Sequence, residues 1–535
     1  MAGTIPMFVQ LALLIGVIGA VRELLEGTES MLSVYPARTG GITLLVPMAA
    51  GAAALALGLA QNRLNPLQRE QGRVSQWTTN GLSIGISLVL GAFVPVGVGV
   101  YWIASNLLTI VQQLVLNAVM PPKKYVDYEE LEKSRQELSA MDVLSSGVSR
   151  EDKLREKEDY KRFFSIANKH LVFYSEKSGY YRNYRALIEQ LLERSNLTIH
   201  YVTSDPKDVM FELANIQPRI KPYYIGEKRL ITLMMKMDAD IVVMTMPDLE
   251  SFHIKRSYVR KDIEYIYLFH AIASTHMIYR KGAFDHYDTI FCVGPHHSRE
   301  IRETEELYGL PAKNLVEFGY PLLDDLLDQY GRLERNGDKP KILIAPSHHE
   351  GNIMDSCLED ILAALLKKNW QVIVRPHPQY VCRNPGQVEE LKQRWAGREN
   401  LLFETDFTTN ESQYTSDILI TDWSGISMEY SFVTHHPCIF VNTPMKVLNP
   451  EYTKYQAVPA LLEVREKIGV SFEPTDVTGI AAAAEQMLSG AVLPPEEVAA
   501  IAEQYVYHIG GAGQIGASYI IKELQKRQSA KKDSG

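Results

Sequence analysis

The chain has 535 residues, a length that favours several domains, and its 46% hydrophobic and 22% charged residues give it a globular average composition. Charge is distributed unevenly. Residues 1–124 carry seven Lys or Arg against four Glu, so this segment carries +3, and the remainder must carry −12 because the whole chain carries −9. An acidic C-terminal part of this size argues against a general nucleic-acid binder, which needs a basic surface.

The N-terminal segment is predicted to lie in a membrane. Its uncharged stretches are residues 5–21, 41–60 and 81–119. A bilayer core requires about 20 predominantly apolar residues per helix, and the last stretch is long enough for two helices that meet near Pro95. We therefore expect four membrane helices, at about 4–22, 41–60, 79–93 and 95–119.

The positions of the cations predict the orientation of these helices, because Lys and Arg accumulate in cytoplasmic loops. Arg63, Arg69 and Arg73 fall in the second loop, and Lys123 and Lys124 follow the fourth helix. Both termini are then cytoplasmic. The four cysteines have no paired spacing typical of a disulfide framework or a zinc site, which agrees with a cytoplasmic C-terminal part. The predicted location is the cell membrane, with several crossings.

The first 120 residues resemble part of a YidC-type membrane insertase. The resemblance rests on Gly-Thr-Ile-Pro-Met-Phe-Val-Gln (3–10), on Asn65-Pro66 with Gln68, and on the segment from Pro95 to Gln113. Members of that family have one further helix before these, with an arginine in a hydrophilic groove. The predicted spans of this chain hold no internal arginine, which favours a membrane anchor, with insertase activity as the alternative.

The remaining chain is predicted to form two α/β domains. Residues 121–167 are rich in charged side chains and should form a charged helical linker. Short apolar runs then alternate with helical segments, which is typical of a parallel sheet covered by helices. The predicted strands are 170–174, 198–202, 240–244, 265–269, 289–293, 341–345, 371–374, 417–421 and 438–441. We therefore expect two Rossmann-like domains that face a cleft, at 168–335 and 336–525, followed by a polar tail at 526–535.

Two candidate catalytic residues follow predicted strands. His270 ends the strand at 265–269, and a histidine at the mouth of a cleft can accept a hydroxyl proton near neutral pH. His377 lies in Arg375-Pro376-His377-Pro378, where the prolines fix the backbone while guanidinium and imidazole offer donors to phosphate oxygens.

A turn after the strand at 417–421 is the predicted anion site. Thr421, Asp422, Ser424 and Gly425 supply hydroxyl, carboxylate and backbone N–H groups at the start of a helix, where anions bind well. Glu429 lies one helical turn further on. Its carboxylate cannot contact a phosphate favourably, so we expect it to bind the ribose hydroxyls or a positive neighbour.

Another polar cluster closes the strand at 341–345. Pro346 and Ser347 are predicted to contact the substrate. Adjacent residues in a turn rarely converge on one ion, so His348, His349 and Glu350 are not expected to bind a metal.

Together these motifs resemble the CDP-glycerol glycerophosphotransferases of teichoic acid synthesis. The resemblance extends from about His170 to Ile520 and is strongest in Phe-Gly-Tyr-Pro (318–321), Ala-Pro-Ser (345–347), Arg-Pro-His-Pro (375–378) and Ile-Thr-Asp-Trp-Ser-Gly-Ile (420–426). It implies the two-domain GT-B fold. His270 matches the proposed catalytic base of that family. The positions that match its donor contacts are Pro346, Ser347, Arg375, Pro376, His377, Ser424, Gly425 and Glu429.

The resemblance implies transfer of glycerol phosphate from CDP-glycerol to a lipid-linked polyol-phosphate acceptor at the inner leaflet, with release of CMP. No cofactor is expected. The chain departs from the family pattern at Ala271, where Gly is usual, at Leu322, where Arg is frequent, and at Gly425, where a second serine is usual. CDP-ribitol or a nucleotide sugar therefore stays open as the donor, as does nucleotide binding without turnover.

Overall fold

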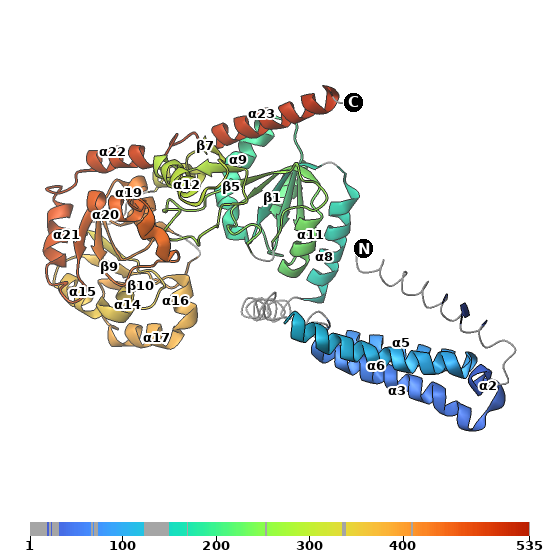
Figure 1. The fold of residues 1–535 in the computed structure, drawn as a ribbon. Helices are drawn as coiled ribbons and strands as arrows, with labels where there is room; N and C mark the ends of the chain where they lie inside the picture. The colour runs from blue at the N-terminus through green and yellow to red at the C-terminus, as the bar shows by residue number, and fades with distance from the viewer. Residues whose placement is uncertain are drawn as a thin grey trace. The chain divides into compact units, whose positions relative to one another are not determined.

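The computed structural model describes residues 16, 19–20, 23, 31–65, 68, 73–121, 149–167, 169–251, 254–333, 339–407 and 410–533. The chain divides into two compact units, residues 1–140 and 141–535 (Figure 1). Most of the first predicted membrane helix and most of the predicted linker lie outside the described residues.

The first unit is a bundle of three long helices, α3 (Leu45–Leu64), α5 (Arg73–Phe93) and α6 (Val96–Val119), in which α3 packs against both others. Short elements precede them: η1 (Met31–Ser33), α2 (Pro36–Thr39) and η2 (Gly41–Leu44). Close packing explains a glycine here, since a Cβ on Gly51 would lie 2.7 Å from a Leu88 methyl carbon.

Two described segments are long and apolar enough to cross a membrane, Gly41–Leu64 and Val96–Val119. They correspond to the second and fourth predicted helices. The prediction of four such helices is only partly supported, because α5, which contains the predicted 79–93, does not meet the same criterion. The reason is its polar content, including Asn80 and Ser87, which are buried within the bundle.

The second unit contains two parallel sheets, so the two predicted α/β domains are confirmed. The first sheet has seven strands in the order β3-β2-β1-β4-β5-β6-β7. Their bounds are β1 Lys169–Ser175, β2 Ile199–Thr203, β3 Ile220–Tyr224, β4 Ala239–Met244, β5 Glu264–Leu268, β6 Thr289–Cys292 and β7 Asn314–Glu317. Its accompanying helices are α8 Arg150–Ser165, η4 Ser178–Tyr180, α9 Tyr181–Arg194, α10 Met210–Ile216, α11 Glu227–Met235, α12 Pro295–Tyr308 and α13 Pro321–Tyr330.

The second sheet has six strands in the order β10-β9-β8-β11-β12-β13. Their bounds are β8 Lys341–Ile344, β9 Gln371–Val374, β10 Leu401–Phe403, β11 Ile418–Thr421, β12 Cys438–Val441 and β13 Gly469–Phe472. The helices that follow are α14 Ile353–Ser356, α15 Leu358–Leu365, α16 Pro378–Arg383, α17 Pro385–Arg394, α18 Glu411–Thr415, α19 Ile426–Thr434, η5 Pro450–Lys454, α20 Ala460–Ile468, α21 Ile480–Leu488, α22 Pro495–Tyr505 and α23 Ala512–Asp533.

Both sheets reverse their strand order at one point, between β1 and β4 in the first sheet and between β8 and β11 in the second. Ligands of open α/β sheets bind outside the carboxyl ends of the strands at such switch points. The central strands are buried on both faces, as parallel strands covered by helices must be, which explains their continuous apolar runs.

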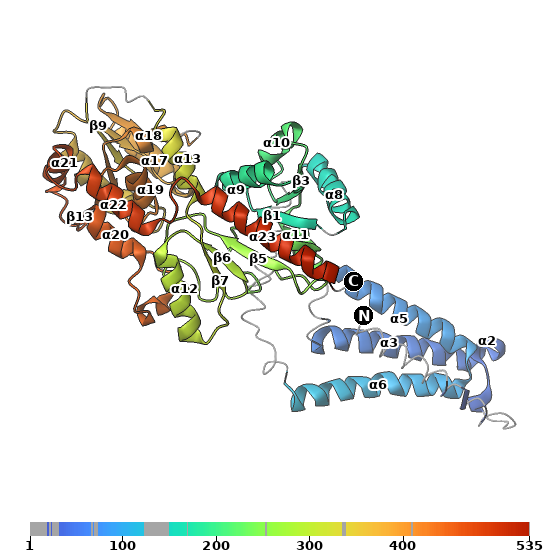
Figure 2. The same cartoon turned by 90° about the horizontal axis from the view of Figure 1, so that it is seen from above.

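The C-terminal helix α23 returns to the first sheet, although the sequence assigns residues up to 525 to the second domain. It lies along α9 (Figures 1 and 2), and its Ile520 and Leu524 are buried in the same apolar cluster as Leu187 of α9. Arg194 of α9 fixes this contact by donating to the Gln514 carbonyl oxygen at 3.0 Å.

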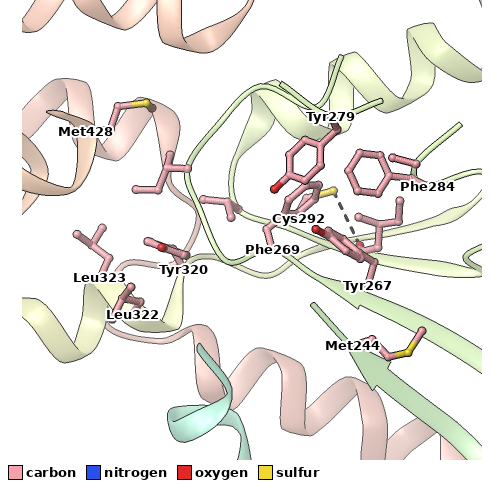
Figure 3. Close-up of a cluster of buried hydrophobic side chains, with 14 of the residues drawn as sticks. Met244, Tyr267, Phe269, Tyr279, Phe284, Cys292, Tyr320, Leu322, Leu323 and Met428 are labelled. Atoms are coloured by element: carbon pink, nitrogen blue, oxygen red, sulfur yellow. Dashed lines mark hydrogen bonds between the residues drawn. The ribbon is translucent and has the colours of Figure 1, made fainter. Parts of the chain in front are cut away.

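One apolar cluster contains residues of both sheets' domains (Figure 3). Tyr320, Leu322 and Leu323 at the start of α13 lie beside Met428 of α19, and the ring of Phe269 belongs to the same cluster. Leu322, at the position where the family that the sequence resembles frequently has Arg, is only 3% exposed and makes an apolar contact here.

Candidate active site

A cavity of about 820 Å³ lies between the two α/β domains, where the carboxyl ends of strands from both sheets meet. Eight of the residues predicted from the sequence line it: His270, Pro346, Arg375, Pro376, His377, Ser424, Gly425 and Glu429. These eight residues, which lie between positions 270 and 429 of the chain, therefore meet at one cavity.

His270 stands two residues beyond the end of β5, with the edge of its ring against Tyr180 at a centroid distance of 5.3 Å. Burial lowers the pKa of His270 to about 4, the Thr245 backbone opposes this shift, and the positive charge of Arg182 adds to it. Its Nδ1 atom is buried and has no hydrogen-bond partner within the described part of the chain. The imidazole is thus neutral at pH 7 and able to accept a proton.

Glu429 projects from the first turn of α19. Its Oε1 accepts a hydrogen bond of 2.7 Å from the Tyr320 hydroxyl, which also lies 3.0 Å from the His270 carbonyl oxygen. Burial raises the pKa of Glu429, while Arg182 and the Tyr320 hydrogen bond lower it. The sequence predicted a ribose or a positive neighbour as partner of Glu429. Arg182 lines the same cavity and is near enough for its positive charge to act on the Glu429 pKa.

Arg375 is held more tightly than the sequence suggested. Its Nη1 lies 2.8 Å from Glu404 Oε1, its Nη2 donates to Asn410 Oδ1 at 3.0 Å, and its side chain is only 6% exposed. The guanidinium also lies over the Phe407 ring at 5.3 Å. Although Arg375 lines the cavity, its charge is already paired within its own domain.

His377 occupies the cap position of α16. Its Nδ1 accepts a hydrogen bond of 3.1 Å from the Gln379 backbone N–H, so in the neutral ring Nε2 carries the proton and can donate. The ring of His348 lies 4.5 Å away. Burial lowers the pKa of His377, and Lys446 and Arg383 lower it further, so the ring is neutral at pH 7.

The turn before α19 is open toward solvent. Gly425 caps this nine-residue helix, and a Cβ added there would meet no atom within 4 Å. The free N–H groups and partial positive charge of a helix start can therefore reach a bound anion. Ser424 adds a hydroxyl at the same place.

Three predicted substrate contacts do not line the cavity. Asp422 is fully buried and accepts hydrogen bonds from the backbone N–H groups of Ser347, at 2.8 Å, and Ile353, at 3.3 Å. Thr421 donates to the Ala345 carbonyl oxygen at 2.6 Å. Ser347 is itself buried and its hydroxyl bonds to His349 Nδ1. These side chains fix the loops at the switch point, because buried polar groups at strand ends require partners.

Several lining residues were missed by sequence reasoning: Lys177, Gly179, Tyr180, Arg182, Asn183, Asp205, Phe407, Asn410, Gln413 and Tyr414. The Ser-Gly turn after β1 could have indicated the lining residues 177–183, because β1 lies at the switch point of its sheet. Among the residues that the structure describes, no group of three or more His, Cys, Asp or Glu side chains could share a metal ion.

Comparison with known proteins identifies one matching family model. It is described as CDP-glycerol:poly(glycerophosphate) glycerophosphotransferase, and it matches residues 144–457, more than half of the chain. No curated protein matches the chain.

Solved structures of similar fold include a variant of the wall teichoic acid polymerase TagF soaked with CDPG, which is 16% identical. That match covers 75% of this chain and 100% of that chain, with a TM-score of 0.46. A putative UDP-N-acetylglucosamine 2-epimerase from Listeria monocytogenes is 14% identical, and the match covers 65% of this chain and 94% of that chain, with a TM-score of 0.44.

Proposed function

Because the chain belongs to the CDP-glycerol:poly(glycerophosphate) glycerophosphotransferase family, we propose that it transfers glycerol phosphate from CDP-glycerol to a hydroxyl of a lipid-linked, teichoic-acid-like acceptor. Its enzymatic class is that of a CDP-glycerol-dependent glycerophosphotransferase. One observation supports the proposal most directly. A neutral imidazole, His270, and the open start of a helix, at Ser424 and Gly425, face the same cavity from opposite domains.

In the proposed reaction, an oxygen of the acceptor attacks the phosphorus that bears glycerol. The bond between this phosphorus and the bridging oxygen breaks, CMP leaves, and a phosphodiester forms. His270 takes the proton of the attacking hydroxyl, for which the neutral ring is required.

The second domain stabilises the negative charge that develops on CMP. His377 Nε2, the Ser424 hydroxyl and the Gly425 backbone N–H are the proposed donors, since phosphoryl transfer depends chiefly on positioned positive charge and hydrogen bonds. Glu429 is proposed to accept from the ribose hydroxyls, with Pro346 and Pro376 as neighbouring walls. A direct phosphate contact by Arg375 would share its guanidinium with Glu404 and Asn410.

The proposed location is the cytoplasmic face of the cell membrane, with the first unit as anchor and both termini cytoplasmic. Two apolar helices, Gly41–Leu64 and Val96–Val119, support an anchor by length and composition. An anchor raises the effective concentration of the enzyme near a lipid-linked acceptor. The relation of this unit to YidC-type insertases stays a prediction.

The test is CMP release from CDP-glycerol by the full-length protein in detergent, with and without a lipid-linked glycerol phosphate primer. We expect primer-dependent release, and loss of at least about 100-fold in kcat in His270→Ala with CDP affinity kept, as for removal of a general base. His200→Ala is the matched control, because His200 is a buried strand histidine whose pKa is also lowered to about 4 but which lies outside the cavity.

The outcomes separate the alternatives. If CDP-glycerol releases no nucleotide but CDP-ribitol or a nucleotide sugar does, the donor is that compound and not CDP-glycerol. CDP binding without turnover of any donor would mean that the α/β part binds a nucleotide but does not catalyse transfer. Complementation of an insertase-depleted strain would then test the insertase alternative.

A further inference from the structure

The Tyr320 hydroxyl is not used by the proposed mechanism, yet it touches two of its residues. It lies 2.7 Å from Glu429 Oε1 and 3.0 Å from the His270 carbonyl oxygen, and Tyr320 is fully buried. A phenol has one hydrogen to donate, and both neighbours are acceptors. The hydrogen can therefore make a good hydrogen bond to Glu429 Oε1 or to the His270 carbonyl oxygen, but not to both at once.

The backbone fixes the position of Tyr320. Gly319 before it has a φ of +100°, and a Cβ there would lie 2.4 Å from the Tyr507 carbonyl oxygen. Pro321 after it begins α13. The ring packs in the apolar cluster beside Leu323 and Met428 (Figure 3). A ring held on every side cannot follow a moving partner, so rotation of the O–H bond is the freedom left to this group.

The contact joins the two α/β domains. Tyr320 and His270 belong to the first domain, and Glu429 belongs to α19, whose start is the proposed anion site. Helices α13 and α19 pack against each other, so the bond lies at a contact between the domains.

A ligand bound at Glu429 would act on the bond that Tyr320 makes to the same carboxylate. Burial raises the pKa of the Tyr320 hydroxyl well above its usual value, so it stays protonated. A ribose hydroxyl that donates to Glu429 Oε1 shares that oxygen with Tyr320 and so weakens the bond that Tyr320 makes there. The phenolic hydrogen can then turn to the His270 carbonyl oxygen and fix the backbone of the residue that carries the imidazole, two residues beyond β5.

We propose that Tyr320 is a positioning residue that couples binding of the donor's ribose at Glu429 to the placement of His270. This inference rests on the proposed function, because it requires the ribose at Glu429 and the base role of His270. In effect, the base is set in place when the donor is bound.

Tyr320→Phe tests the coupling, because it removes one oxygen and keeps the ring. In full-length protein, we expect kcat for primer-dependent CMP release to fall about tenfold, the effect of one buried hydrogen bond, while the Kd for CDP changes by less than about twofold. In a Glu429→Gln background, Tyr320→Phe should lower kcat by a clearly smaller factor than in the wild type, because the effects of coupled residues are not additive.

Tyr430→Phe is the matched control. Tyr430 is the next residue of α19, is fully buried, and donates its hydroxyl to the Ser416 carbonyl oxygen at 3.0 Å. It should lose stability as Tyr320→Phe does and keep its kcat. Equal kcat losses in the two variants, or additive effects of Tyr320→Phe and Glu429→Gln, would overturn the coupling. A wild-type protein that does not turn over CDP-glycerol would instead overturn the proposed function, and the coupling with it.

Discussion

Replacement of Arg375 by Met distinguishes a structural role from a donor-binding role. The side chain is 6% exposed and its Nη1 lies 2.8 Å from Glu404 Oε1, whose own side chain is 17% exposed. The variant leaves the Glu404 carboxylate largely buried without this partner. Breaking a buried ion pair in this way costs about 3–5 kcal/mol, a large part of the roughly 5–15 kcal/mol that stabilises a domain.

A purely donor-binding arginine would behave differently. Loss of a charge-assisted hydrogen bond to phosphate costs about 1.5–3 kcal/mol of binding free energy, and the stability of the free protein would hardly change. Since the guanidinium is already bound to Glu404 and Asn410, we expect the stability loss to exceed the loss of CDP affinity.

The assay is urea unfolding of full-length Arg375→Met in detergent, followed by tryptophan fluorescence, with CDP calorimetry on the folded protein. Arg375→Met/Glu404→Gln should regain much of the lost stability, because the stranded charge is removed. Arg394→Met is the control, since Arg394 pairs with Glu390 at 2.7 Å and with Glu359, all three side chains are about half exposed or more, and its loss should cost less than about 1 kcal/mol. Unfolding of Arg375→Met at the wild-type urea concentration, with CDP affinity reduced more than about tenfold, would refute the structural role.

Two further predictions concern stability. Burial lowers the pKa of His297 to about 4, so below pH 6.5 the unfolded chain binds a proton that the native chain excludes. The free energy of unfolding should therefore fall as the pH drops from 6.5 to 4, with a contribution of up to about 1.4 kcal/mol per pH unit, and His297→Gln should show a shallower fall; equal slopes would contradict this. Gly319→Ala should lose about 1–3 kcal/mol or more in urea unfolding, because of its φ of +100° and the close Tyr507 oxygen. Gly425→Ala has open space and should keep wild-type stability, so similar losses in both glycine variants would contradict the steric reasoning.

The sequence predicted the central strands well and missed strands nearer the sheet edges. β1, β4, β8 and β11 are continuous apolar runs because helices cover both faces of a parallel sheet. β3 was missed: it contains Pro222 and an exposed Lys221, which only an edge strand accommodates. β10 has three residues and no buried one, so its pattern is too short to recognise.

For the candidate site, the sequence located the polar residues at the strand ends, and the structure assigned their environments. His270, His377 and Ser424 line the cavity as expected. The Asp422 carboxylate instead accepts hydrogen bonds from backbone N–H groups outside it. Arg182 was not predicted, because a cation in a helix that follows a strand has no local pattern that distinguishes it from a solvated one.

The amino-acid sequence by itself determined which segments are buried strands, where they end in polar side chains, and that the N-terminal part is apolar enough for membrane helices. These properties depend on neighbouring residues and on the free energy of removing apolar groups from water, so they are visible in a local pattern. Only the tertiary structure decided that Arg375 is paired with Glu404, that α23 returns to the first sheet, and that Tyr320 reaches both His270 and Glu429. Those contacts join residues far apart in the chain, and their geometry is set by the packing of whole domains.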